Sequence, residues 1–132
     1  MKITPDTNVL LRAVVKDDPH QGRAAKAILE SADVVALTLP ALCEFVWMMS
    51  RGYEIAAVEI AEAVRRLVDS VNVVVNRAAV EAGLEMLEKG EDFAGGVLAY
   101  EGRWLGGETF VSFDKSAVQL LAAQGKKSLV PT

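Results

Sequence analysis

The fold of this chain is decided by residues 2–10, which read Lys-Ile-Thr-Pro-Asp-Thr-Asn-Val-Leu. The first part, Lys2 to Pro5, is expected to form a strand that ends at Asp6. The apolar residues from Val9 to Val15 then predict a short helix. A strand that leads through an acidic residue into a helix is typical of proteins in which strands and helices alternate.

Further strands and helices alternate along the rest of the chain. The apolar runs predict strands at 34–39, 71–75 and 109–113, and an edge strand at 128–130. Apolar residues at helical spacing predict helices at 21–31, 55–68, 77–89, 92–105 and 115–124, and one more that begins near Pro40. We therefore predict an α/β fold, an α/β/α sandwich with a central parallel sheet of roughly four to five strands, because apolar parallel strands need helices on both faces.

Length and composition indicate one compact domain. The chain has 132 residues, of which 52% are hydrophobic and 24% are charged, so we expect a single domain over residues 1–132. Cys43 is the only cysteine, which excludes an internal disulfide and fits a reducing cytosol. No targeting signal is visible, and no apolar run approaches the roughly 20 residues of a membrane span. The expected protein is soluble and cytoplasmic and has no membrane partner.

The net charge of −4 helps to decide whether the protein binds nucleic acid through a basic surface. A module that holds nucleic acid through a broad basic face would be basic, so this class is disfavoured. An enzyme that meets a polyanion through bound metal ions and a few local cations stays open, because the metal ions are then the largest positive charges in the site. The 14 Lys and Arg residues can supply such local cations.

Four acidic residues interrupt apolar sequence, namely Asp6, Glu44, Asp92 and Asp114. Because burial of an uncompensated charge is costly, acids in such positions usually gather around a cation or mark a site. An all-oxygen set of ligands suits Mg²⁺ or Mn²⁺. Asp6 and Asp114 both follow predicted strands, and we expect them at the same edge of a parallel sheet. The structural alternative is a helix cap for the three aspartates and a solvent-facing helix position for Glu44.

Taken together, these residues resemble a PIN-domain endoribonuclease, specifically the VapC toxins of type II toxin–antitoxin modules. The resemblance covers nearly the whole chain. Its most specific parts are Asp6-Thr7-Asn8-Val9-Leu10, the helix of Glu44, residues 92–100 and Ser112-Phe113-Asp114. It implies a small α/β/α sandwich whose clustered acids bind Mg²⁺ or Mn²⁺ and hydrolyse RNA.

The resemblance also implies roles for individual residues. Asp6, Glu44 and Asp114 match the catalytic, metal-binding acids, whereas Asn8 and Ser112 match the polar residues that support them. Asp6 would be the principal ligand of the metal ion, and the other two acids would hold or orient its waters. Such a protein is further expected to bind a VapB-like antitoxin, which blocks the acidic pocket, and to form a homodimer within that complex.

One position departs from the family pattern. Residues 92–96 read Asp-Phe-Ala-Gly-Gly, so Gly95 stands where the family has its third metal-binding aspartate. Asp92 lies three residues earlier on the predicted helix, about 60° off the same face, so we expect it to cap the helix and to reach a metal only through water or a shifted helix start. The alternative function is therefore a catalytically impaired PIN domain that acts mainly by binding its antitoxin.

Other readings of the sequence are weaker. A haloacid-dehalogenase-like phosphatase would require an aspartate two residues after Asp6, and Asn8 occupies that place. Trp104 and Leu105 are expected in the core at a helix end. Trp47 is expected either in the core or in an exposed apolar patch that binds a partner.

Overall fold

A computed structural model describes residues 1–132. Backbone contacts divide the chain into two compact units, which we call unit 1 (Met1–Asn76) and unit 2 (Arg77–Thr132). The elements of unit 1 are β1 Lys2–Ile3, α1 Thr7–Val14, α2 Pro19–Ser31, β2 Val34–Ala36, α3 Leu39–Trp47, the π-helix η1 Met48–Gly52, α4 Ala57–Asp69 and β3 Val73–Val74. The elements of unit 2 are α5 Arg77–Glu88, α6 Phe93–Trp104, β4 Phe110–Val111, α7 Lys115–Ala123 and β5 Ser128–Leu129.

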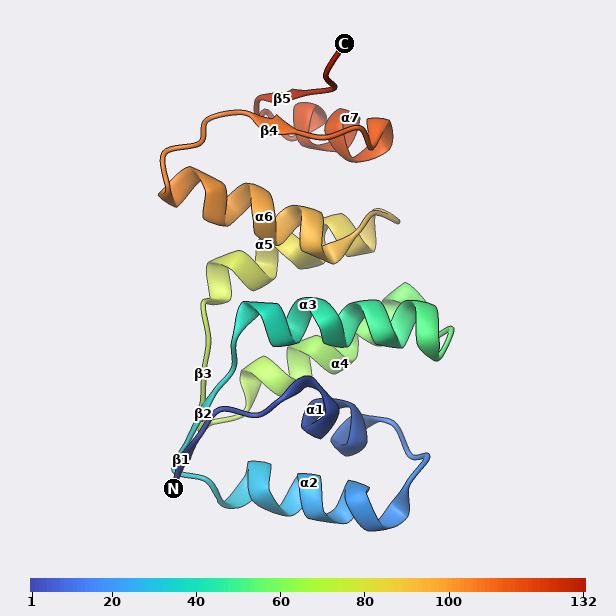
Figure 1. The fold of residues 1–132 in the computed structure, drawn as a ribbon, viewed down its shortest axis with the longest axis vertical. Helices are drawn as coiled ribbons and strands as arrows, with labels where there is room; N and C mark the ends of the chain where they lie inside the picture. The colour runs from blue at the N-terminus through green and yellow to red at the C-terminus, as the bar shows by residue number, and fades with distance from the viewer. The chain divides into compact units, whose positions relative to one another are not determined.

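The three strands of unit 1 form a parallel sheet in the order β1-β2-β3. Val35 lies at its centre, paired with Ile3 on one side and with Val73 on the other. Helices α1 and α2 connect the first two strands, and α3, η1 and α4 connect the second and third (Figure 1). Parallel strands joined through helices confirm the predicted α/β class.

Unit 2 contains a second parallel pair, in which Phe110 of β4 lies opposite Ser128 of β5. The five strands of the chain are thus paired as a three-stranded and a two-stranded sheet, and a central sheet of four to five strands is not shown. Each strand is also shorter than predicted. The run at 34–39 ends as a strand at Ala36, because Thr38 accepts a hydrogen bond from the Ala41 amide at 3.3 Å and caps α3.

Local sequence signals explain where several helices begin and end. Asp18 caps α2 by accepting a hydrogen bond from the Gln21 amide at 3.0 Å, and Pro19 occupies the first turn. At the other end of a helix, Gly90 follows α5 with a φ of 83°. A residue without a Cβ adopts this left-handed conformation at little cost, so Gly90 ends the helix as predicted.

Arg12 ties three segments of unit 1 together. Its Nε donates to Gln21 of α2 at 2.7 Å, and its Nη1 contacts both carboxylate oxygens of Asp17 in the turn after α1. The Tyr53 hydroxyl, which follows η1, lies 3.4 Å from the same Nη1 and donates to Asp17 at 3.0 Å. The hydrogen bond with Tyr53 and the charge of Asp17 raise the pKa of Arg12, so the guanidinium stays charged.

Glycines allow α5 and α6 to pack closely within unit 2. A Cβ on Gly96 would overlap the backbone carbonyl of Ala82, and a Cβ on Gly83 would lie 2.6 Å from the ring of Phe93. Any side chain at these positions would force the two helices apart. Gly95 differs, because its Cβ would meet only the Met86 methyl group at 3.8 Å, an ordinary contact distance.

The core of unit 2 is a cluster of buried side chains from α5 and α7. Met86, Ala117 and Leu121 form this cluster, and the half-buried Ala99 and Phe110 pack against it. These contacts join four of the five elements of the unit, namely α5, α6, α7 and β4. Phe110 thereby holds the short strand β4 against the helices.

The structure corrects one expectation about the core. Trp104 and Leu105 are 77% and 88% exposed, so they do not lie in the core at a helix end. The reason is that α6 ends at Trp104 and the chain turns at Gly106, which has a φ of 98°. Trp47 is 55% exposed, which agrees with the alternative of a surface apolar residue. None of the helices combines the length and the apolar character that a bilayer crossing requires.

Candidate active site

Asp6 lies at the carboxyl end of β1 and caps α1. Its Oδ1 accepts a hydrogen bond from the Thr7 amide at 2.8 Å, with Asp6 in an extended conformation. The carboxylate is exposed, and its Oδ2 accepts no hydrogen bond from the protein. The capping role is therefore confirmed, and it leaves one oxygen of Asp6 available to a ligand.

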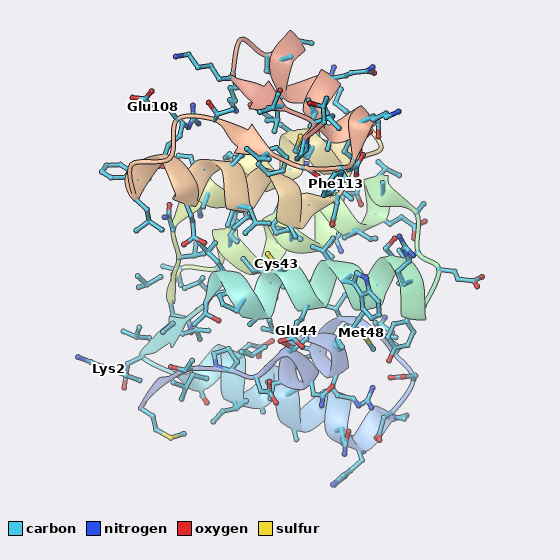
Figure 2. All side chains as sticks on the ribbon, turned by 45° about the horizontal axis from the view of Figure 1, so that its top comes forward. Lys2, Cys43, Glu44, Met48, Glu108 and Phe113 are labelled. Carbon is cyan, nitrogen blue, oxygen red and sulfur yellow. The ribbon has the colours of Figure 1, made fainter.

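Glu44 reaches the same region from α3. The Thr7 hydroxyl lies 3.4 Å from Glu44 Oε1 and can donate to it. Figure 2 shows the Glu44 carboxylate on the side of α3 that faces α1. Glu44 is exposed, which agrees with the alternative prediction of a solvent-facing helix position. Its carboxylate nevertheless lies next to the start of α1, where it contacts Thr7.

Thr7 connects the two carboxylates and was not anticipated from the sequence. Its amide binds Asp6 and its hydroxyl contacts Glu44, although it is only 7% exposed. It is the one polar residue that is fully buried in the structure. A threonine directly after a strand-terminal aspartate is the only local signal, because the contact with Glu44 spans 37 positions.

Asn8 lies exposed on α1, and its side chain donates to neither carboxylate. It lines a shallow pocket between α1 and α2, together with Val9, Gln21 and Ile28. The support that the resemblance assigns to Asn8 is thus supplied in unit 1 by Thr7.

Asp114 caps α7 in unit 2. Its Oδ1 accepts hydrogen bonds from the Ala117 amide at 3.1 Å and from the Ser116 hydroxyl at 2.9 Å. The backbone bond, followed by the Ser116 hydroxyl, lowers the pKa of Asp114. Ser112 accepts a hydrogen bond from the Asp114 amide at 3.0 Å, so it fixes the backbone at Asp114 and leaves the carboxylate to Ser116 and Ala117.

Asp92 caps α6, as predicted, with Oδ1 3.3 Å from the Ala94 amide. Gly95 lies in the first turn, and its amide donates to the Asp92 carbonyl at 3.1 Å. A Cβ at residue 95 would overlap no atom, since its nearest neighbour is the Met86 methyl group at 3.8 Å. The glycine is therefore not required by packing.

The predicted site residues fall into two sets. Asp6, Asn8 and Glu44 belong to unit 1, whereas Asp92 and Asp114 belong to unit 2. Within each unit, no group of three or more His, Cys, Asp or Glu side chains is gathered so that it could hold a metal ion. The convergence of Asp6 and Glu44 with Asp114 stays a prediction.

A comparison with protein families matches residues 3–99 to the PIN domain. This range covers most of the chain and begins at β1, where Asp6 follows. The chain belongs to the PIN domain family. PIN domains are commonly nucleases and generally bind divalent metal ions. A comparison with curated proteins found no significant match.

The matched range has two consequences for this PIN domain. It runs across the boundary between Asn76 and Arg77, so the family unit includes parts of both units. It also contains Asp6, Glu44 and Gly95, whereas Asp114 lies beyond its end. The site roles of Asp114 and its neighbours therefore depend on the sequence resemblance alone.

The donor set of unit 1 is compatible with a hard divalent cation. Asp6 and Glu44 offer carboxylate oxygens, and Mg²⁺ is commonly held through one or two carboxylates together with water and substrate phosphate. Both carboxylates are exposed, so water and a large substrate can reach them. The PIN domain thus has part of a plausible metal site on the surface of unit 1.

Proposed function

We propose that this PIN domain is a Mg²⁺- or Mn²⁺-dependent endoribonuclease, a VapC-like toxin whose activity is weakened by Gly95. The observation that carries the proposal is the pair Asp6 and Glu44, which Thr7 holds together beside the carboxyl end of a parallel strand. Ligand sites in open parallel sheets lie at this end of the strands. Hydrolysis of an RNA phosphodiester fits a site in which carboxylates hold a divalent ion.

Each residue of the site has a defined task in this proposal. When bound, the metal ion would supply a polarised water and would neutralise charge at the phosphate. Asp6 holds the ion through the oxygen that does not cap α1, and Glu44 positions its waters. The resemblance to VapC toxins gives Asp114 of unit 2 a part in holding the same ion; hydrogen bonds from the Ala117 amide and the Ser116 hydroxyl lower the pKa of its carboxyl group.

We further propose that residues 1–132 work as a single PIN-like domain. Support comes from the family match, which runs without interruption from unit 1 into α6 of unit 2. The RNA substrate, the VapB-like antitoxin, the homodimer and the cytoplasmic location belong to the same proposal, and they rest on the resemblance to VapC toxins.

The proposal is tested by restoring the acid at residue 95. Gly95→Asp should bind Mg²⁺ more tightly than the natural chain and should cleave a structured RNA such as tRNA much faster. The matched control is Gly95→Ala, which adds the same Cβ next to Met86 without a carboxylate. Metal affinity is measured by calorimetry without RNA, and cleavage is followed on gels with Mg²⁺ or Mn²⁺.

A further substitution tests the role of Asp6. In the Gly95→Asp background, Asp6→Asn should abolish cleavage, although asparagine still caps α1. The nuclease proposal is wrong if neither the natural chain nor Gly95→Asp cleaves RNA with any divalent metal while both are folded.

The alternative is a catalytically impaired PIN domain that acts mainly by binding its antitoxin. One observation favours it, namely the glycine at residue 95, where the resemblance expects a metal-binding aspartate. It predicts that the natural chain and Gly95→Asp bind the antitoxin equally and that the natural chain has little metal affinity. Direct binding measurements with the purified antitoxin separate the two functions.

A further inference from the structure

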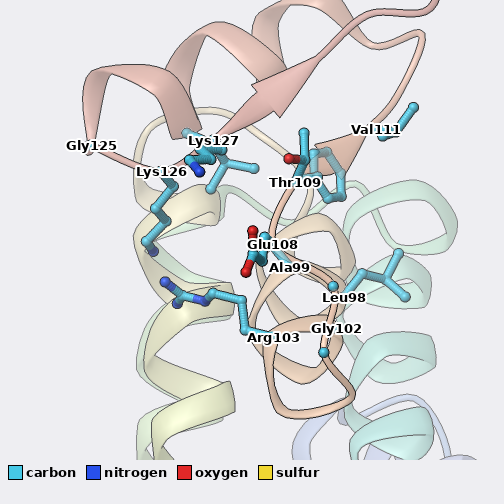
Figure 3. A pocket seen from close by; sticks show the side chains of 14 residues that line it. Leu98, Ala99, Gly102, Arg103, Glu108, Thr109, Val111, Gly125, Lys126 and Lys127 are labelled. Atoms are coloured by element: carbon cyan, nitrogen blue, oxygen red, sulfur yellow. The ribbon is translucent and has the colours of Figure 1, made fainter.

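Unit 2 contains a pocket of about 640 Å³ that none of the candidate site acids lines. It lies between the carboxyl-terminal half of α6, the loop that leads to β4, and the turn before β5 (Figure 3). Its volume is within the range of about 300–1,000 Å³ that small-ligand sites occupy. The sequence analysis did not predict this pocket, because its walls form only when residues 98–111 and 121–127 fold against each other.

Positive charge collects at the rim of this pocket. Arg103, Lys126 and Lys127 line it, and Glu108 is its only acid. Unit 2 has six Lys and Arg residues in total, so half of them surround one cavity: Arg77, Lys89, Arg103, Lys115, Lys126 and Lys127. None of the three rim cations forms an ion pair with a carboxylate.

The two cations that come from opposite walls are directed toward one place. In Figure 3 the charged ends of Arg103, from α6, and Lys126, from the turn before β5, converge on the same side of the pocket. Like charges repel each other, so this arrangement favours an anion near them, and the Glu108 carboxylate, which Figure 3 also shows in the pocket, supplies only one negative charge beside the three cations. Phosphate is a suitable anion, because guanidinium and ammonium groups both bind its oxygens strongly.

The rest of the pocket is apolar. Leu98 and Ala99 of α6 form one wall, and Phe110 and Val111 of β4 form another. Leu98 and Val111 are 62% and 54% exposed, which is unusual for large aliphatic side chains in such a concave place. A flat apolar group would cover both walls, and the half-buried ring of Phe110 could stack on it.

We propose that this pocket binds one nucleotide of single-stranded RNA, with the phosphate at Arg103 and Lys126 and the base against Phe110 and Leu98. A nucleotide combines the anion and the flat ring that the two halves of the pocket require. The proposal rests on the proposed function in one respect, the choice of RNA as the polymer. The pocket then anchors the substrate at a point that contains none of the catalytic acids.

Gly102 allows the pocket to be closed without damage to the fold. It lines the pocket from α6, and a Cβ at this position would meet no atom within 4 Å. A phenylalanine at residue 102 would therefore extend into open space, and it would replace a glycine that is unfavourable inside a helix. Gly102→Ala is the matched control, since it changes the backbone preference without filling the pocket.

The test measures the affinity of the full chain for a fluorescently labelled single-stranded oligoribonucleotide in the presence of a metal chelator. Lys126→Glu should weaken binding at least tenfold relative to Lys89→Glu, which makes the same charge change elsewhere in unit 2. It should also reduce the slope of log affinity against log salt by about 0.7, the value for one lost phosphate contact with a single strand. Gly102→Phe should lose affinity, and Gly102→Ala should not.

Two results would overturn the proposal. One is equal RNA affinity for Lys126→Glu and Lys89→Glu together with equal affinity for the two Gly102 variants. The other is that Lys126→Glu loses affinity for an acidic peptide, such as polyglutamate, while its affinity for RNA is unchanged. That result would identify a protein partner.

The test is independent of the nuclease proposal because it contains no divalent metal and requires no cleavage. RNA binding through the pocket without cleavage under any metal would contradict only the nuclease. Cleavage with an unchanged KM in Lys126→Glu would contradict only the pocket.

Discussion

At the scale of single residues, Thr7 decides how the acids of unit 1 are arranged. Its backbone amide donates to Asp6 and its buried hydroxyl contacts Glu44, so one residue lies between two exposed carboxylates and touches both. Neither carboxylate is held by an ion pair, and without Thr7 the Glu44 carboxylate would be free to sample several rotamers. Thr7 is therefore best described as a positioning residue.

Replacement of Thr7 by valine should separate this role from packing. Valine has nearly the same shape, so Thr7→Val should lower the free energy of unfolding by only about 1 kcal/mol or less, since the 3.4 Å bond is long and Glu44 can turn to water. In the Gly95→Asp background it should weaken Mg²⁺ binding about tenfold, the lower end of the effect of losing an outer hydrogen bond.

Thr7→Ser serves as the control for this substitution, because it retains the hydroxyl that contacts Glu44. Calorimetry should show Mg²⁺ affinity restored in Thr7→Ser. If Thr7→Val binds Mg²⁺ as tightly as Thr7→Ser, the positioning role of Thr7 is wrong.

At the scale of elements, the contact of α5 with α6 gives two adjacent glycines opposite roles. Gly96 faces the backbone of α5 at Ala82, where no side chain fits, whereas a Cβ on Gly95 would make only an ordinary contact with the Met86 methyl group. Glycine weakens a helix at either position, because the unfolded chain has more conformational freedom there. The structure shows that Gly96 is required for helix packing. Gly95 also weakens the helix, but packing does not require it.

Alanine at each position should therefore shift stability in opposite directions. Gly95→Ala should raise the free energy of unfolding by about 0.5–1 kcal/mol, the gain in helix propensity over glycine. Gly96→Ala should lower it by about 1–3 kcal/mol or more, because its methyl group overlaps the Ala82 carbonyl. Urea denaturation of the two variants measures both values. Equal stabilisation by both would contradict the packing of α5 on α6 described here.

The presence of the helices and strands was predicted from the sequence with more success than the residues at which they begin and end. The helix predicted at 77–89 ends at Gly90, whereas α2 begins at Pro19, two residues before the predicted start at residue 21, because Asp18 caps it and the proline occupies its first turn. The strand at 34–39 was predicted too long, because burial continues through Leu37 and Leu39 while Thr38 already caps the next helix. A run of apolar residues indicates that a segment is buried. It does not indicate where the backbone hydrogen bonds of a strand end.

At the scale of the whole molecule, the predicted site depends on acids from both units. The α/β class and the family follow from the sequence, and the capping roles of Asp6, Asp92 and Asp114 are confirmed. The contact of Thr7 with Glu44 and the exposure of Trp104 could not be foreseen, because both depend on how separate segments meet in space. The convergence of the acids can be tested in solution without a structure.

A double-mutant cycle on Asp6→Asn and Asp114→Asn tests whether the two carboxylates share one site. Asparagine caps helices as well as aspartate, so each change removes charge and leaves α1 and α7 capped. If the carboxylates repel each other, the effects on the free energy of unfolding should deviate from additivity by about 0.5 kcal/mol or more without metal. Saturating Mg²⁺ should change this coupling, because a shared cation reverses the repulsion.

Strict additivity with and without Mg²⁺ would place the two acids too far apart to act on one phosphate. The nuclease proposal would then have to rely on Asp6 and Glu44 alone.

The close approach of α6 to α5 has an evolutionary consequence. Because the backbone contact at Gly96 fixes the rotation of α6, the direction of any side chain at residue 95 is set in advance, about 100° around the helix from that contact. A single change at the second base converts every glycine codon into a codon for an acidic residue. A carboxylate at residue 95 is thus one mutational step away, and the Cβ that carries it would not overlap the α5 backbone as one at Gly96 would.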